Sequence, residues 1–122
     1  MIHLMRNMKK IYLCNKNIDE NTNREIFSQP TEYKLNVQPL SNTGEIIAFG
    51  EDYRGRLAIY TSQEKASNFH NGDRCYVFQD KPEIYDKFCS TADYYVDGEP
   101  LIYLGEATIY LQRMTSSDVE YE

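Results

Sequence analysis

Three cysteines and two histidines are the first candidates in this chain for a nucleophile, a base or a metal ligand. Cys14, Cys75 and Cys89 are widely separated, and no Cys-x-x-Cys pair occurs. Structural zinc sites use closely spaced ligands, and disulfide frameworks use even numbers of cysteines, so this spacing favours neither. We therefore expect reduced, mostly buried thiols and no bound metal or cofactor.

A thiol–imidazole pair of Cys89 and His70 is the catalytic arrangement that these residues could form. Their separation in sequence neither supports nor forbids a meeting in space. His70 lies in a polar loop sequence, where a solvated histidine is the more common outcome. His3 lies in the N-terminal segment and has no partner of suitable chemistry beside it. The sequence predicts that the protein is not an enzyme.

Adjacent carboxylates occur in polar segments, for example at Asp19-Glu20 and Glu51-Asp52. Such pairs can bind calcium or exchange protons, but neighbouring acidic residues in polar loops are usually solvated surface. Segment 51–56 also contains two arginines. Two interpretations stay open for it, charge pairing with a neighbouring subunit or an ion pair within the chain. The candidate contact residues of this segment are Glu51, Asp52, Arg54 and Arg56.

The elements that would position these residues are short strands. Turn signals such as Asn71-Gly72 separate short runs rich in β-branched and aromatic residues. The runs cover residues 10–14, 24–28, 31–37, 57–60, 74–78, 92–96, 101–104 and 107–112. This pattern predicts a mainly β fold, a small antiparallel β-barrel or sandwich.

The strongest strand signal is interrupted at Pro39. Within residues 31–37 the side chains of Tyr33, Leu35 and Val37 share one face. Pro39 has no N–H to donate to a ladder, so the strand must stop, bulge or lie at an edge there. We expect a long loop or a short helix to be inserted after Pro39, with a helical turn or a short strand near Glu45.

We expect one domain at residues 9–114, with an extended loop region at about 41–72. Residues 1–8 and the acidic residues 115–122 are expected to be flexible tails. No stretch is apolar and long enough to cross a membrane, so we expect a soluble, intracellular protein with no membrane partner.

The charge of the chain argues against a nucleic-acid-binding module. The formal net charge is −6, whereas such modules carry a basic patch that neutralises phosphates. The chain also has eleven tyrosines and no tryptophan. Tyrosine is common both at half-exposed sheet positions and at interfaces, so the excess fits a β-rich fold and a docking surface equally well.

The order of these segments resembles the head-closure proteins of tailed bacteriophages, also called stopper or head–tail joining proteins, especially those infecting Gram-positive hosts. The segments that carry the resemblance are Val37-Gln38-Pro39-Leu40-Ser41, Ile46-Ile47-Ala48-Phe49-Gly50, Gly72-Asp73-Arg74-Cys75-Tyr76-Val77, Ala92-Asp93-Tyr94-Tyr95-Val96 and Thr108-Ile109-Tyr110-Leu111-Gln112-Arg113. The resemblance covers roughly residues 9–113 as a pattern, and its motifs are short.

The resemblance implies a small β-barrel whose copies form a homo-oligomeric ring in the virion, at the head–tail junction. Portal and adaptor proteins would lie above the ring and tail proteins below it, with double-stranded DNA passing without sequence-specific binding. The protein would be made in the host cytoplasm. Residues 41–71 would face the channel or the next subunit, with Glu51, Asp52, Arg54 and Arg56 as contacts. Negative charge beside the conduit would limit sticking of DNA.

Three alternatives stay open. The first is a neighbouring connector component such as a tail terminator. The second is an OB-like module that binds single-stranded nucleic acid, with tyrosines as stacking platforms; the acidic residues Asp93 and Asp97 flanking Tyr94-Tyr95 count against it. The third is a small enzyme that uses Cys89 or His70.

Overall fold

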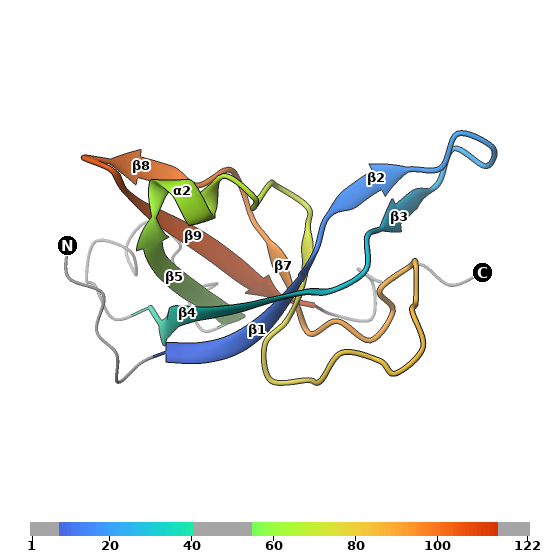
Figure 1. Ribbon diagram of the computed structural model, residues 1–122, viewed down its shortest axis with the longest axis horizontal. Coiled ribbons are helices and arrows are strands. Elements are labelled where there is room, and N and C mark those ends of the chain that lie inside the picture. Colours follow the sequence, from blue (N-terminus) through green and yellow to red (C-terminus); the bar gives the residue numbers. More distant parts are fainter. Residues whose placement is uncertain (1–7, 41–54, 115–122) are drawn as a thin grey trace.

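Six antiparallel strands close into a β-barrel in the computed structural model, which describes residues 8–40 and 55–114 (Figure 1). Around the barrel the strands follow the order β5-β4-β1-β6-β7-β9, and pairing of β5 with β9 closes the ring. Their bounds are β1 Met8–Cys14, β4 Thr31–Pro39, β5 Arg56–Ser62, β6 Arg74–Tyr76, β7 Tyr94–Val96 and β9 Glu106–Arg113. The predicted mainly β fold is confirmed, and of the two predicted architectures the barrel is the observed one.

Two hairpins extend from the barrel toward opposite ends of its long axis (Figure 1). One is a separate two-stranded sheet of β2 (Lys16–Ile18) and β3 (Glu25–Phe27). The other is formed by β8 (Leu101–Tyr103) and the first half of β9. A single turn of helix, α2 (Gln63–Ala66), follows β5 directly. No helix in the described ranges is long and apolar enough to span a bilayer.

The barrel interior is filled by the inward-facing residues that alternate along its strands. The predicted face of β4 is confirmed, because Leu35 is buried and Tyr33 and Val37 pack against the core. Strand β9 alternates between buried and half-buried positions, as expected for a strand with one face toward the core and one toward solvent. The buried members of this core include Ile11, Leu13, Leu57, Ile59, Phe69, Val96, Ile109 and Leu111.

Within the expected loop region at about 41–72, the strand predicted at 57–60 is confirmed as β5, which is longer than predicted and central to the barrel. Strand β5 pairs with β4 from Asn36↔Tyr60 to Pro39↔Leu57 and with β9 along its whole length. Its side chains Leu57, Ala58 and Ile59 are buried. The polar stretch after it also contains α2, whose first N–H groups are capped by Ser62. Residues 41–54, including the predicted turn near Glu45, lie outside the described residues.

Strand β6 ends at Tyr76, two residues before the predicted end at Phe78. The backbone N–H groups of Val77 and Phe78 donate to the two carboxylate oxygens of Asp93, each at 2.8 Å. A carboxylate therefore replaces the strand partner at this point, and the chain leaves the sheet. The following segment carries Cys89 and Ala92, which pack with Cys14, Phe27 and Tyr76 in a second, smaller apolar cluster.

Candidate interaction surface

The tip of the β8–β9 hairpin exposes four consecutive large apolar side chains, Leu101, Ile102, Tyr103 and Leu104. The most exposed of them is Leu104, at 85% of its surface. Strand β8 pairs with β9 from Leu101↔Thr108 to Tyr103↔Glu106. Within the described residues no strand pairs with its other edge. An apolar strand with one open edge is a surface that proteins normally cover, so this hairpin is the candidate interaction surface.

The turn of this hairpin holds Leu104 in a backbone conformation that leucine rarely adopts. Leu104 has φ +51° and Gly105 has φ +81°, between the paired residues Tyr103 and Glu106. Positive φ at both central positions is the pattern of a type I′ turn, where Asn, Asp or Gly is strongly preferred. A leucine here is strained and places its side chain in water. Neither property helps the isolated chain, which points to a contact outside it.

The segment that forms this hairpin is acidic as well as apolar. From Asp97 to Gln112 it carries Asp97, Glu99 and Glu106, and it contains no lysine or arginine. The Glu99 carboxylate accepts a hydrogen bond from the backbone N–H of Asn71 at 3.4 Å and lies 3.8 Å from His70 Nδ1. Both side chains of the His70–Glu99 pair are mostly exposed. Of the three acidic residues, Asp97 is ion-paired with Arg56, Glu99 precedes β8, and Glu106 directly follows the turn.

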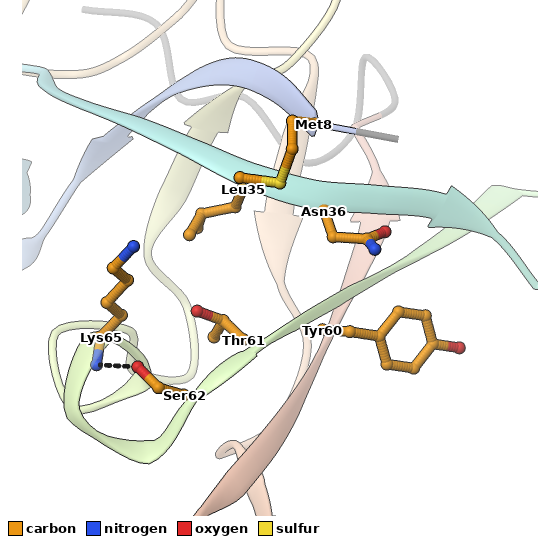
Figure 2. A pocket seen from close by; sticks show the side chains of 7 residues that line it. All are labelled: Met8, Leu35, Asn36, Tyr60, Thr61, Ser62 and Lys65. Atoms are coloured by element: carbon orange, nitrogen blue, oxygen red, sulfur yellow. Dashed lines mark hydrogen bonds between the residues drawn. The ribbon is translucent and has the colours of Figure 1, made fainter. Parts of the chain in front are cut away.

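A pocket of about 170 Å³ opens where β4 and β5 separate (Figure 2). In Figure 2 the side chains of Leu35 from β4 and Thr61 from β5 point toward each other across it, and Lys65 extends along one end. Asn36↔Tyr60 is the last β4–β5 pair, so Leu35 has no partner on β5. The lining residues are Met8, Leu35, Asn36, Tyr60, Thr61, Ser62 and Lys65.

Lysines gather on the elements around this pocket. Lys10 and Lys34 face each other directly across the β1–β4 ladder, and Lys65 lies on α2. Like charges at directly opposed positions repel, which favours an anionic neighbour. Within the described part of the chain Lys65 forms no ion pair, while Lys10 lies 3.9 Å from Glu32. Of these three lysines, Lys65 alone lines the pocket.

The predicted contact residues of segment 51–56 are placed only in part. Glu51, Asp52 and Arg54 lie outside the described residues. Arg56 is the first residue of β5 and forms an ion pair with Asp97, in which the arginine side chain is 13% exposed. Of the two interpretations left open for this segment, the structure supports an ion pair within the chain for Arg56. A contact of this segment with another subunit stays a prediction.

The candidate catalytic pair is not assembled. His70 is exposed and lies beside Glu99, whereas Cys89 is buried in the smaller apolar cluster with Cys14. No hydrogen bond joins His70 to Cys89 among the described residues. Nor do three or more metal-ligating side chains gather within those residues. His3 lies outside them.

The three cysteines are buried and free, as expected for reduced structural thiols. Burial raises the pKa of the Cys75 thiol, and the nearby carboxylates of Asp73 and Asp93 act in the same direction. A hydrogen bond with Cys89, together with burial, raises the pKa of the Cys14 thiol. Since the thiolate is the reactive form, Cys14 and Cys75 are poor nucleophiles in the folded protein.

The paired tyrosines of β7 are poorly placed for stacking on bases. Tyr94 is a member of the barrel core and is 7% exposed. The guanidinium of Arg74 lies 5.8 Å from the centre of the Tyr95 ring and 4.8 Å from that of Phe27. One ring is therefore inside the barrel and the other already has a cationic neighbour, which weighs against the OB-like alternative.

Comparison with known proteins finds a similar fold but no matching family. No protein-family model matches the chain, and no curated protein matches its sequence. Among solved structures, the solution structure of protein SF1141 from Shigella flexneri 2a superposes with a TM-score of 0.61. The two chains are 14% identical, and the match covers 93% of this chain and 99% of that one. At this identity the likeness concerns the fold.

The β8–β9 hairpin was not singled out by the sequence patterns. Residues 101–104 predict a strand, and an apolar strand in a small barrel is normally part of the core. The signal that could have identified the surface is the lack of alternation in Leu101-Ile102-Tyr103-Leu104, directly before Gly105. Successive side chains of a strand point to opposite faces, so a run of four apolar residues makes both faces of the strand apolar. Beside a tight turn, at the end of a hairpin, the two faces cannot both be buried in the core.

Proposed function

We propose that the chain is a structural component of a phage head–tail connector, a head-closure protein. Its copies form a ring below the portal and adaptor, close the DNA channel and offer the surface to which the tail attaches. The observation that carries this proposal is the apolar β8–β9 tip on a closed barrel. A closed barrel leaves few free edges, so an exposed apolar hairpin points to an assembly contact.

Three further observations support an assembly role over a chemical one. The order of sequence segments resembles the head-closure family, and within the described residues His70 and Cys89 do not meet and no cluster of three or more metal-ligating side chains occurs. The net charge of −6 suits a wall beside a DNA conduit, because it disfavours non-specific adhesion of phosphates. In this role no enzymatic activity, cofactor or membrane is required.

The experiment that tests the proposal measures assembly on a connector. The purified protein is analysed by sedimentation velocity alone, then mixed with reconstituted portal–adaptor rings from the same genome and imaged by electron microscopy. We expect a monomer or weak oligomer in isolation and a ring of added density on the adaptor face. A tight dimer that ignores the connector would contradict the proposal.

A second measurement tests whether the protein alone binds nucleic acid. The protein alone should give no shift of short single-stranded or double-stranded oligonucleotides in a gel at low salt, because the net charge is negative. A salt-sensitive shift of single-stranded oligonucleotides would favour the OB-like alternative. A tail terminator would instead assemble on tail tubes and leave portal–adaptor rings bare.

A further inference from the structure

We infer that Cys14 and Cys89 are a redox pair that closes to a disulfide and fastens the segment at residues 77–92 to the outside of the barrel wall. Both thiols are free and buried in the structure, which is the reduced state of the pair. The bond forms within one chain and needs neither a ring nor a partner protein. It is therefore a property beyond the proposed connector function.

The pleat of the sheet separates Cys14 from Cys75 and leaves Cys89 as its partner. Cys14 lies opposite Arg74 in the β1–β6 ladder, and Leu13 lies opposite Cys75. Directly opposed residues share a face, and successive residues point to opposite faces. Cys75 accordingly belongs to the barrel core, whereas Cys14 packs on the other side of the wall in the smaller apolar cluster.

The segment that carries Cys89 covers this outer side of the wall. No helix or strand lies between β6 and β7, a stretch that the structure describes completely. The backbone N–H of Phe27 donates to the Lys87 carbonyl at 2.7 Å, and the Tyr85 hydroxyl donates to the Phe27 carbonyl. Cys89 is thereby packed into the same cluster as Cys14. Two cysteines 75 positions apart in sequence thus share one small buried site.

The backbone at Cys89 is held in a conformation that residues with a side chain rarely adopt. Its φ is +48°, and the conformation is kept by local hydrogen bonds. The Cys89 N–H donates to the Asp86 carbonyl at 3.1 Å, and the Ala92 N–H donates to the Cys89 carbonyl at 3.2 Å. Strain of this kind persists where the surrounding structure fixes a side chain in one place, often for a functional reason. Here the side chain that it places is a thiol facing another thiol.

The two thiols have unequal acidity. The Cys14 thiol donates a hydrogen bond to the Cys89 sulfur, which lowers the pKa of Cys89, and the Tyr76 hydroxyl acts in the same direction. The same bond is the largest cause of the raised pKa of Cys14. Cys89 is thus the thiol that ionises first and attacks an oxidant. Once Cys89 is in a mixed disulfide, its sulfur is no longer a thiolate, and this cause of the raised Cys14 pKa is removed.

Oxidation by a low-molecular-weight disulfide such as oxidised glutathione balances in two steps. When the segment opens locally, the Cys89 thiolate attacks one glutathione sulfur, so that a mixed disulfide forms and one glutathione thiolate leaves. The Cys14 thiolate then attacks the Cys89 sulfur and releases the second glutathione. Two electrons pass from the cysteines to the reagent, and the two thiol protons end on the two glutathione molecules.

The bond would act as a staple that depends on the redox compartment. It closes a long loop between the end of β1 and the irregular segment, and a disulfide that closes a long loop stabilises the folded state by restricting the unfolded chain. Reducing cytoplasm keeps such a pair open, and an oxidising medium closes it. A virion protein, as proposed above, would pass from the first setting to the second at lysis.

The first test maps the bond. The reduced full-length chain is incubated with oxidised glutathione under native conditions, remaining thiols are alkylated, and tryptic peptides are analysed by mass spectrometry. We expect a peptide joining Cys14 to Cys89 in most molecules, with Cys75 alkylated. The matched control, Cys75→Ala, should form the same link, whereas Cys89→Ala should form none. The absence of a link in the wild type, a link through Cys75, or glutathione retained on Cys89 would overturn the inference.

The second test measures the staple. We expect oxidation to raise the melting temperature of the wild type and of Cys75→Ala by at least about 5 °C, the scale for a disulfide in a domain of this size. Dithiothreitol should reverse the shift, and Cys14→Ala treated in the same way should show none. A melting temperature that stays constant or falls when the bond forms would contradict a stapling role. Wild type and Cys75→Ala carry this result even if Cys14→Ala does not fold.

Both tests use the isolated chain, so their outcomes are separate from those of the connector experiment. A chain that forms the Cys14–Cys89 bond but ignores portal–adaptor rings keeps the redox pair and loses the proposed function. A chain that assembles on those rings but cannot form the bond keeps the function and overturns the redox pair.

Discussion

The carboxylate of Asp73 accepts a hydrogen bond of 2.8 Å from the backbone N–H of Lys16. This bond ties the first residue of β2 to the segment that precedes β6. The other carboxylate oxygen accepts from Asn15 Nδ2 at 2.8 Å and from the backbone N–H of His70 at 2.9 Å. Asp73 is only 2% exposed. One buried carboxylate therefore joins the segment Asn15-Lys16 to the loop that contains His70 and Asp73.

Replacing Asp73 by Asn should destabilise the fold. Both carboxylate oxygens of Asp73 accept hydrogen bonds. An Asn side chain has only one acceptor oxygen, so its NH2 group would face one of the present N–H donors and lose that bond. We expect the free energy of unfolding to fall by about 2–4 kcal/mol, the range for lost bonds to a buried charged group. Urea denaturation followed by circular dichroism measures this change. A loss below about 0.5 kcal/mol would show that the two segments are held together by other contacts.

Asp86 should contribute to the stability of the segment 77–92 in a pH-dependent way. Partial burial acts to raise its pKa, but hydrogen bonds from the Ser90 hydroxyl and from the backbone N–H groups of Phe88 and Ser90 leave it below 3.8. A carboxylate whose pKa is lowered by folding stabilises the folded state above its unfolded pKa. That stabilisation is lost as the pH falls through the lower pKa of the folded state.

The comparison of the wild type with Asp86→Asn reveals this contribution. We expect the wild type to be the more stable protein at pH 6–7 and the difference to shrink below about pH 4, where the unfolded carboxyl takes up its proton. Urea midpoints at several pH values measure it. A difference that stays constant down to pH 2 would mean that the carboxylate charge is not involved.

The thiols should be protected from alkylation in the native protein. Cys14, Cys75 and Cys89 are each no more than 2% exposed, and the raised pKa values of Cys14 and Cys75 keep those thiols protonated at neutral pH. We expect labelling with a maleimide to be at least about a hundredfold slower than in 8 M urea, because it requires local or global opening. Mass spectrometry counts the adducts. Fast labelling of Cys89 alone would identify the segment around it as locally mobile.

The ion pair of Arg56 with Asp97 should matter more than the exposed pair of Lys10 with Glu32. The Arg56 side chain is 13% exposed, whereas both partners of the other pair are about 60% exposed. We expect Arg56→Ala to cost about 1–2 kcal/mol of folding free energy. The matched control, Lys10→Ala, should stay within about 0.5 kcal/mol. If both substitutions cost the same, the Arg56 pair contributes no more than a solvated surface pair.

The strand pattern was largely predictable from local sequence. Residues 31–37 and 107–112 alternate apolar and polar side chains, and the observed β4 and β9 contain both ranges. Period-two alternation works as a signal because successive side chains of a strand point to opposite faces. Boundaries were less predictable. Strand β4 continues to Pro39 and β6 stops at Tyr76, since the first is decided by pairing with β5 and the second by the carboxylate of Asp93.

The candidate site depended on contacts between distant parts of the chain. Residues 57–60 were predicted as a short strand inside a long loop region, and only pairing with both β4 and β9 makes them part of the barrel wall. For Arg56 the sequence left open a partner in a neighbouring subunit or within the chain, and its partner is Asp97, far away in sequence. The pocket at Leu35 and Thr61 exists because β4 and β5 separate there, which neither strand encodes alone.

By itself, the sequence of this protein determined a mainly β chain with buried, widely spaced thiols and an acidic surface. These features follow from side-chain type and local period, which act over a few residues. The tertiary structure decided that the β5–β9 pairing closes the sheet into a barrel. It also decided that Leu101–Leu104 lies in water and that Asp73 lies inside. Burial of a side chain depends on which distant segments of the chain pack against it. Similar local patterns can therefore end in the core or on the surface.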